Sequence, residues 1–492
     1  MRIVILYFLL LCFHPLLAQK KVLGKVNELV TAGDAQAHLT FLAADEMRGR
    51  DTGSPEIDIA ANYLAMQFKL FGASPGAGGG SYFQDVQLEK IMPATSAELT
   101  IGSDVMKLKD DLLFMGGGSV TLDKEIIFIG YGTPEDFKKN EVRDKIVVTF
   151  AGTPTTKNGV EALLTDAPLK NKLAVANGAA ALIEIMTFPG VPWQGLVGFL
   201  SAERLVTKKD QSGVFPHLMM RNVDLPSVKA LQETKKSSGK LVINAGLTAA
   251  VKAKNVVAII EGTDATLKQE WITISAHYDH VGVKKSNNNP DSIYNGARDN
   301  AIGTVALLET AKFFEHNRPK RSVLLLAVTG EEKGLLGSEW YANHPLVPLN
   351  KTVFNLNCDG AGYNDTTIAT VIDLNRTNVD AVLTKACQAY GLTLKGDPAP
   401  DQNLYERSDN VNFAVKGIPS VNISPGIKAF DPELFKYYHK PADEVSSLNM
   451  HYLEKFYRAF VYASHLLTND PTRPSWKQGD KFEEAGKRLY SK

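Results

Sequence analysis

Two adjacent acids, Glu331 and Glu332, follow the apolar run 322–328 and lie in a Gly-Glu-Glu-Lys-Gly turn at 330–334. Neighbouring residues leaving a strand point in different directions, so the two carboxylates can do different work. One can bind a metal ion while the other accepts a proton from a water molecule that the metal activates. By itself such a pair is more often a solvated turn, so the metal interpretation depends on ligand types at other strand ends.

Other metal-ligand types do follow the apolar runs 271–276 and 353–358. His277 and Asp279 come after the first run, and their spacing places them on one face of a strand, with His280 on the other face and therefore outside the predicted site. Imidazole is a standard zinc ligand, and a nearby carboxylate often orients a ligating histidine. Asp359 follows the second run. A lone histidine or aspartate here would be an ordinary structural residue.

Two further motifs complete the set. Asp299 lies in Asn-Gly-Ala-Arg-Asp-Asn at 295–300, just before a predicted helix, where an aspartate is usually a helix cap but can also bridge two cations with its two oxygens. Tyr438 and His439 lie in a loop before the last long predicted helix. Each motif has an ordinary explanation, but the coincidence of five at strand ends favours a metal site.

The elements that must position these residues alternate between strand and helix. Strands are predicted at 256–260, 271–276, 322–328, 353–357 and 418–423. Helices are predicted at 304–314, 379–390 and 450–467. This alternation predicts an α/β fold with a mostly parallel mixed sheet flanked by helices on both faces. The working site of such a sheet lies at the carboxyl ends of its strands.

The rest of the chain divides into segments of different predicted secondary structure. Residues 19–85 are predicted to be an N-terminal helical part of the domain formed by 251–470, and 86–250 is a β-rich insertion without clustered ligands. The segment 471–492 is a tail of partly helical character, for which the sequence suggests no function. Residues 1–18 are predicted to be a signal peptide cleaved after Ala18, with a lipoprotein at Cys12 as the minor alternative. The protein is therefore expected to be exported, either periplasmic or extracellular.

Composition excludes several classes of partner. The 492 residues carry 54 basic and 54 acidic side chains, with a pI near 7.1, so neither nucleic acid nor an acidic membrane surface is an expected partner. No transmembrane anchor is expected, and the oligomeric state stays open. Cys358 and Cys387 are too few for a disulfide scaffold, and a buried free thiol is expected at Cys358.

The motifs as a set resemble the binuclear-zinc exopeptidases, a family that includes secreted aminopeptidases, glutamate carboxypeptidase and glutaminyl cyclase. The matching segments are HYD at 277–279, NGARDN at 295–300, TGEEKGLLGS at 329–338, NCDG at 357–360 and YYHKPAD at 437–443. The fold implied for this core is the phosphorylase/hydrolase-like one. The β-rich insertion resembles a protease-associated domain, through GYG at 130–132, DKIVVTF at 144–150 and ANGAAALI at 176–183.

This resemblance implies roles for the candidate residues. Two zinc ions would be held by five ligands, namely His277 and Asp359 on one ion, Glu332 and His439 on the other, and Asp299 bridging them. Glu331 would be the general base acting on the water shared by the zincs, Asp279 would orient His277, and Tyr438 would support the oxyanion. Arg407, Ser408 and Asp409 match a family segment near the substrate, where Asn410 replaces the usual histidine.

The leading functional prediction is a secreted zinc aminopeptidase acting on peptides, and three alternatives stay open. A carboxypeptidase of this family would use several arginines to bind a substrate carboxylate, and only Arg298 and Arg407 lie near the motifs. Relatives with glutaminyl-cyclase chemistry use one zinc and lack the first histidine, which is present here as His277. A catalytically dead binding protein would have lost ligands, and none of the five is missing.

Overall fold

The computed structural model describes residues 19–156, 158–187, 192–208, 215–222, 224–285, 290–372 and 374–491. The signal peptide predicted at 1–18, with its cleavage site, lies outside these residues. The chain forms two compact units, one comprising the segment up to Gln87 together with Lys252–Lys492 and the other comprising Leu88–Val251. The chain passes between the units within β2 (Phe83–Ile91) and again within β12 (Thr248–Ile260), which are neighbours in one sheet.

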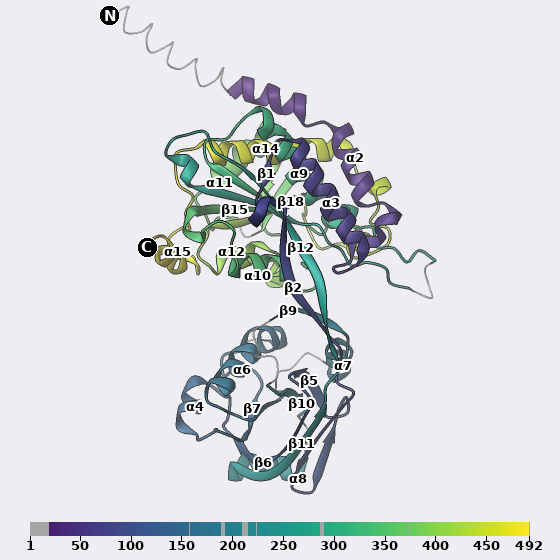
Figure 1. The fold of residues 1–492 in the computed structure, drawn as a ribbon, viewed down its shortest axis with the longest axis vertical. Helices are drawn as coiled ribbons and strands as arrows, with labels where there is room; N and C mark the ends of the chain where they lie inside the picture. The colour runs from purple at the N-terminus through teal and green to yellow at the C-terminus, as the bar shows by residue number, and fades with distance from the viewer. Residues whose placement is uncertain are drawn as a thin grey trace, which may run out of the picture. The chain divides into compact units, whose positions relative to one another are not determined.

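A large mixed sheet organises the first unit (Figure 1). Its order is β17-β16-β18-β15-β13-β14-β12-β2-β9, with β1 paired to β12. The strands at its centre, β14-β13-β15-β18, run parallel, whereas β12 and β16 pair antiparallel with their neighbours β14 and β18. The bounds not yet given are β1 (Ser74–Pro75), β9 (Arg204–Thr207), β13 (Trp271–His277), β14 (Ser322–Val328), β15 (Thr352–Cys358), β16 (Ile368–Ile372), β17 (Thr393–Lys395) and β18 (Ser420–Pro425).

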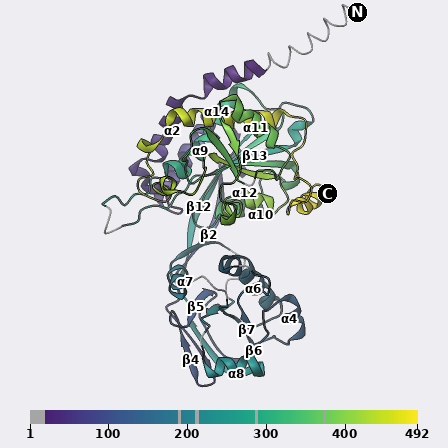
Figure 2. The same cartoon turned by 180° about the vertical axis from the view of Figure 1, so that it is seen from behind.

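Both faces of this sheet are covered, which explains why its strands are continuous apolar runs. In β14, alternate residues enter different cores, with Val323, Leu325 and Ala327 on one side and Leu324, Leu326 and Val328 on the other. Five helices cover the first face: α2 (Ala32–Leu42), α3 (Pro55–Leu70), α9 (Ile302–His316), α11 (Asp380–Ala389) and α14 (Met450–Asn469). The second face packs against α10 (Leu336–Asn343) and α12 (Asn410–Ala414), and Figure 2 shows these two on the side of the sheet away from α14.

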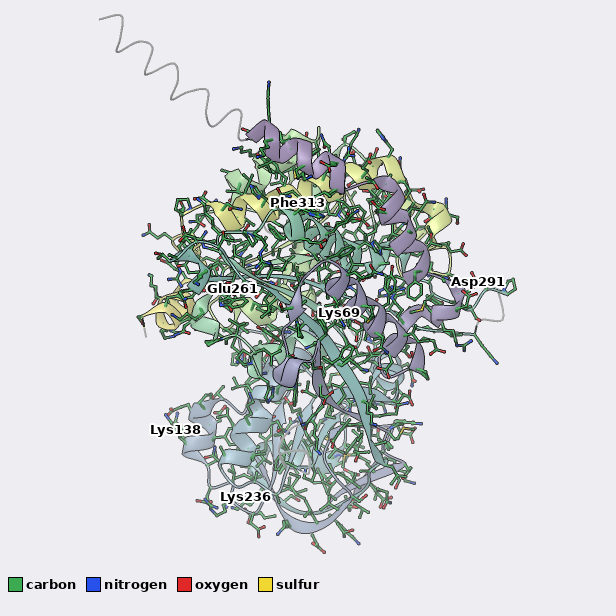
Figure 3. All side chains as sticks on the ribbon, turned by 45° about the horizontal axis from the view of Figure 1, so that its top comes forward. Lys69, Lys138, Lys236, Glu261, Asp291 and Phe313 are labelled. Carbon is green, nitrogen blue, oxygen red and sulfur yellow. The ribbon has the colours of Figure 1, made fainter. Side chains whose placement is uncertain are left out.

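Local sequence sets where these helices begin and what they bury. α3 starts at Pro55 because the Ser54 side chain accepts a hydrogen bond from the Ile57 N–H. Asn449 caps α14 in the same way. Phe313 of α9, labelled in Figure 3, is fully buried and packs edge-on against His465 of α14, with ring centroids 5.7 Å apart.

The second unit has its own sheet and core. The order of its sheet is β4-β3-β11-β6-β7-β8-β10-β5, and β6, β7, β8 and β10 run parallel. The bounds are β3 (Ser96–Ile101), β4 (Asp104–Lys107), β5 (Leu112–Gly116), β6 (Val120–Phe128), β7 (Ile146–Phe150), β8 (Ala181–Ile185), β10 (His217–Met220) and β11 (Lys236–Asn244), with helices α4 (Pro134–Lys139), α6 (Ala167–Ala176), α7 (Trp193–Leu200) and α8 (Pro226–Thr234). Its identification as a protease-associated domain stays a prediction.

The predicted fold class is confirmed: the first unit is a mixed α/β sheet, parallel at its centre and flanked by helices. The tail packs onto this unit through Trp476, whose indole N–H donates to the Gly417 carbonyl, and ends in α15 (Glu483–Tyr490). Cys358 and Cys387 are buried free thiols. Within the described part of the chain, none of the helices has the length and apolar character needed to span a bilayer.

Candidate metal centre

Neighbouring strand ends bring the sequence motifs together. β15, β13 and β14 are consecutive in the sheet, so His277 at the end of β13 lies between Asp359, which follows β15, and the Glu331-Glu332 pair, which follows β14. Gly330 has a φ of +70°, a left-handed conformation that glycine adopts without strain, and it turns the chain so that both acids reach the sheet edge. The loops carrying Asp299 and His439 complete the site.

The first group of donor atoms comes from His277, Asp299 and Asp359. His277 Nε2 lies 3.1 Å from Asp359 Oδ1 and 3.4 Å from Asp299 Oδ1. All three donor atoms lie within 4.8 Å of one another. Glu331 stands beside this group, with its Oε2 4.0 Å from His277 Nε2.

A second group uses the other oxygen of Asp299. His439 Nε2 lies 3.1 Å from Asp299 Oδ2 and 3.1 Å from Glu332 Oε1. His280 belongs to the same group, because its Nδ1 is 2.8 Å from Glu332 Oε1 and 4.0 Å from Asp299 Oδ2. Asp299 therefore has one carboxylate oxygen in each group. The structure thus brings together all five residues predicted as ligands and adds His280, which the strand periodicity had placed elsewhere.

The electrostatics of the site show an unmet demand for positive charge. Burial by itself lowers the pKa of His439, yet the nearby carboxylates of Asp299 and Glu332 outweigh burial and raise this pKa to about 10. Burial likewise opposes protonation of His277, but the charges of Asp359 and Glu331 raise its pKa well above the ordinary value. A surplus of carboxylates that pulls protons onto the buried His277 and the partly exposed His439 is a surplus that divalent cations can neutralise.

The donor set fits zinc. Imidazole nitrogens and carboxylate oxygens are the usual ligands of this ion, and its tetrahedral sites have ligand–ligand separations of about 3.3–3.6 Å, given bonds of about 2.0–2.2 Å. The separations in the two groups, 2.8–4.0 Å, surround these values. Within the described ranges, Glu332 Oε1 and both ring nitrogens of His280 are buried without a hydrogen-bond partner, as ligand atoms without their ion would be.

Glu331 is suited to move protons. Burial, together with the neighbouring charges of Asp359 and Asp409, raises the pKa of this carboxyl well above its usual range. Its backbone N–H donates to Asp279 Oδ1 at 3.2 Å, and that of Glu332 donates to Asp279 Oδ2 at 3.3 Å. The carboxylate of Asp279 thus fixes the turn that presents both acids.

The structure corrects the role expected for Asp279. Its carboxylate lies 3.7 Å from His277 Nδ1, too far for a hydrogen bond, and this nitrogen instead lies 3.2 Å from the backbone carbonyl of Asp279. A carbonyl oxygen only accepts, so the proton of His277 is on Nδ1 and its Nε2 is free to bind a metal. The orienting group is the main chain at 279, and the carboxylate serves the glutamate turn instead.

The Arg407-Ser408-Asp409 segment contributes unequally to the pocket. Ser408 Oγ donates to Asp359 Oδ2 at 2.5 Å, so Ser408 orients a candidate ligand. Arg407 lines the pocket beside the donor atoms, whereas Asp409 is fully buried and accepts a hydrogen bond from Ser338 at 2.5 Å. Asn410, at the position of the usual histidine, is buried, donates to the Tyr405 carbonyl and does not line the pocket in the described structure. Asn410 therefore contributes no side chain to this lining.

A pocket opens over the donor atoms. Tyr438 lines it, stacked on His439 with ring centroids 4.2 Å apart, and burial raises the pKa of its hydroxyl. The remainder of the lining is partly apolar, with Ile372, Leu404, Ile427 and Phe430. Acids therefore form one side of the pocket, and apolar side chains form much of the rest.

The sequence interpretation missed three residues that hold the loops of the site. Arg50 is fully buried and donates to four backbone carbonyls, those of Leu42, Tyr278, Asn295 and Gly296. Asp443 accepts from the N–H groups of Arg298 and Asp299, and Arg298 itself donates to the Ser447 carbonyl. Arg298 and Asp443 lie inside quoted motifs, but spacing gave no indication of these contacts.

Comparison with known proteins identifies the core. Peptidase family M28 matches residues 255–464, the segment that carries the whole donor set. This match confirms the predicted resemblance to the binuclear-zinc exopeptidases.

One solved structure supports the fold of this chain. An aminopeptidase from Aneurinibacillus sp. strain AM-1 matches with a TM-score of 0.57 at 20% identity, covering 91% of this chain and 97% of that one. A zinc aminopeptidase from Bacillus subtilis matches with a TM-score of 0.47 at 20% identity, covering 90% of this chain and 97% of that one. The first likeness supports a shared fold.

Curated relatives of this chain include a "Vacuolar membrane protease" from Sclerotinia sclerotiorum, 25% identical over 46% of this chain and 21% of that protein. A protein of the same name from Saccharomyces cerevisiae is 34% identical over 23% of this chain and 10% of that protein. The matches thus span about a fifth or less of these relatives. Their names contradict the expected periplasmic or extracellular location, because they refer to a vacuolar membrane, and that expectation is withdrawn.

Proposed function

We propose that this chain is an aminopeptidase that binds two zinc ions and hydrolyses N-terminal residues from peptides. The observation that carries the proposal is the pair of donor groups that share Asp299, with Glu331 beside them but outside both groups. His277 and Asp359 would hold one ion, and Glu332 and His439 the other. When bound, the zinc pair supplies Lewis-acid activation of water and of the scissile carbonyl.

The chain's own residues would perform the remaining steps. Glu331 takes the proton from the attacking water at its carboxylate and later delivers it to the leaving amine. A raised pKa keeps this carboxyl close to the range in which it can do both. Tyr438, held by stacking on His439, offers its hydroxyl to the developing oxyanion.

The charge of the pocket supports an aminopeptidase over a carboxypeptidase. Four acids line it, and Arg407 is the single arginine or lysine in the lining that the structure describes. A substrate α-ammonium group suits such a surface through charge-assisted hydrogen bonds. A C-terminal carboxylate would be repelled, apart from whatever Arg407 binds. The apolar lining favours peptides that begin with an apolar residue.

The test of the general base is Glu331→Gln, with Glu433→Gln, an exposed acid of α13 (Pro432–Phe435), as the matched control. The variant should keep its zinc, because Glu331 is outside both donor groups, and should lose on the order of 10²–10⁴ in kcat. Zinc content by elemental analysis and turnover of an aminoacyl-arylamide measure the two effects. Control-like turnover would contradict the role of Glu331, and loss of zinc would make it a ligand instead.

Substrate panels separate the alternatives. Aminoacyl-arylamides, N-blocked peptides and peptides beginning with glutamine are compared with and without a chelator. An aminopeptidase cleaves the aminoacyl-arylamides, can also release the first residue of the glutamine peptides, leaves N-blocked peptides intact and stops when its metal is removed. Cleavage of N-blocked peptides would favour a carboxypeptidase, cyclisation of the glutamine peptides would favour a cyclase, and no turnover by zinc-loaded protein would favour a binding protein.

A further inference from the structure

His280 lies in a position that the alternation of side chains along a strand did not predict. β13 ends at His277, and the next residues turn, so that the His280 N–H donates to the Arg50 carbonyl and residue 280 forms a bridge with Asp51. The side chain is fully buried. A Cβ at Gly296 would lie only 2.6 Å from the Cγ of the His280 ring, so this glycine provides the space that the imidazole fills.

The hydrogen bonding of His280 is incomplete. Neither ring nitrogen has a partner among the described residues, and the same holds for Glu332 Oε1. Yet His280 Nδ1 and Glu332 Oε1 lie only 2.8 Å apart. A buried polar group without a partner is destabilising, and here two such groups face each other. Two buried electron-pair donors at this short separation have the arrangement expected of two ligands of one cation.

The geometry of four donor atoms agrees with a single ion. His280 Nδ1, Asp299 Oδ2, Glu332 Oε1 and His439 Nε2 lie within 4.8 Å of one another, and the four measured separations run from 2.8 to 4.0 Å. A tetrahedron around zinc has edges of about 3.3–3.6 Å. Two nitrogens and two oxygens would therefore complete the protein coordination of this ion.

The other group lacks such a fourth donor. Its atoms are His277 Nε2, Asp299 Oδ1 and Asp359 Oδ1. The second oxygen of Asp359 is engaged by Ser408, and Glu331 Oε2 stands 4.0 Å from His277 Nε2 beside the group. Three protein ligands with an open position are typical of catalytic zinc, whereas four are typical of structural zinc.

We propose that His280 is a fourth protein ligand of the metal ion held by Asp299, Glu332 and His439, which makes the two metal sites unequal. The four-donor site fills first and holds its ion tightly. The three-donor site of His277, Asp299 and Asp359 fills second and keeps the open position for water and substrate. This inequality concerns metal binding alone, and it holds whatever substrate the protein cleaves.

The first test uses the wild-type protein. The metal-free chain is loaded with one zinc ion per molecule, and X-ray absorption spectroscopy counts the imidazole ligands. Two imidazoles are expected, from His280 and His439. A single imidazole, or an ion that divides evenly between two one-histidine sites, would overturn the proposal.

The second test uses variants and zinc competition with a chromophoric chelator. His280→Ala should weaken the tighter site by more than the roughly 10- to 100-fold that loss of a merely orienting partner costs. His280→Asp, whose carboxylate oxygen can occupy the place of Nδ1, should restore much of the affinity. His465→Ala is the matched control, a mostly buried histidine of α14 outside both groups. Unchanged tight binding in His280→Ala, or no rescue by aspartate, would show that His280 is not a ligand.

Discussion

The fork of hydrogen bonds from Arg50 gives the sharpest stability prediction. Its guanidinium is fully buried, and its three nitrogens donate to the carbonyls of Leu42, Tyr278, Asn295 and Gly296 at 2.5–2.9 Å. Two of these carbonyls belong to the loop that precedes Asp299 and one to the turn between His277 and His280. Arg50 therefore ties the N-terminal segment to two of the loops that carry metal donors.

The proposed change is Arg50→Lys, which keeps the charge and most of the length. An ammonium group presents its donors from one atom and cannot reproduce the planar fork, so we expect it to reach at most two of the four carbonyls. The Gly296 carbonyl also accepts from the Ala301 N–H, so one or two buried carbonyls are then left without a donor, at about 1–3 kcal/mol each. The predicted loss of unfolding free energy is about 1–6 kcal/mol, a large part of the stability of an ordinary domain.

Arg48→Lys is the matched control two residues away. The side chain of Arg48 is 56% exposed and makes one ion pair, with Glu56 at 3.5 Å. Exposed pairs of this kind contribute about 0–1 kcal/mol, so the control should behave like the wild type.

Urea unfolding of the metal-free proteins, followed by tryptophan fluorescence, measures the difference. Three of the four tryptophans report on the first unit, namely Trp271, Trp340 and Trp476. The midpoint should fall for Arg50→Lys and stay in place for Arg48→Lys. Equal midpoints for the two variants would refute the assignment of these four hydrogen bonds as a major stabilising contact.

Two further predictions concern pH and metal affinity. Burial raises the pKa of Glu309 to about 8 in the folded chain, against 4.5 when unfolded. The stability that this group contributes is therefore fully present below pH 4.5 and is lost as the pH rises toward 8. The loss is about 1.4 kcal/mol per pH unit and about 5 kcal/mol in total. Glu309→Gln should remove this component from the pH dependence of thermal unfolding, and a variant with the wild-type slope would contradict it. Ser408→Ala removes the hydrogen bond to Asp359 Oδ2 and should weaken zinc at the His277 group roughly 10- to 100-fold in chelator competition. Unchanged affinity would mean that Asp359 is held by other contacts.

The sequence predicted the sheet because its strands are buried, and buried strands are continuous apolar runs. The run at 322–328 is β14 to the residue, since the side chains from Val323 to Val328 alternate between two cores and Ser322 before them is buried too. β16 and β17 were not predicted, because they are short strands with no distinctive pattern. Likewise, composition showed that residues 86–250 are rich in β-structure but could not give the parallel pairing of β6, β7, β8 and β10.

The metal centre was predictable where ligands follow strands and unpredictable where the chain turns. The alternation rule excluded His280 because it extrapolated β13 past His277, its last residue. The positive φ of Gly296 and its contact with the His280 ring depend on folding of a distant loop. The same limit applies to Asp279, whose carboxylate and carbonyl serve different partners. Spacing along a strand indicates a direction, and it does not indicate which atom of a residue is used.

The first unit is built from two stretches of the chain separated by Leu88–Val251, and this has a consequence during synthesis. Its N-terminal helices α2 and α3 emerge from the ribosome before Leu88–Val251, whereas the sheet that buries them, apart from β1 and the start of β2, comes afterwards. At about 5–20 residues per second, the intervening segment delays their partners by on the order of ten to thirty seconds. During that interval Leu64 and Phe68, both fully buried in the finished core, have no sheet to pack against. Nascent chains stalled before β12 should therefore be protected by chaperones or aggregate, whereas the unit formed by Leu88–Val251, continuous in sequence, can fold during the wait.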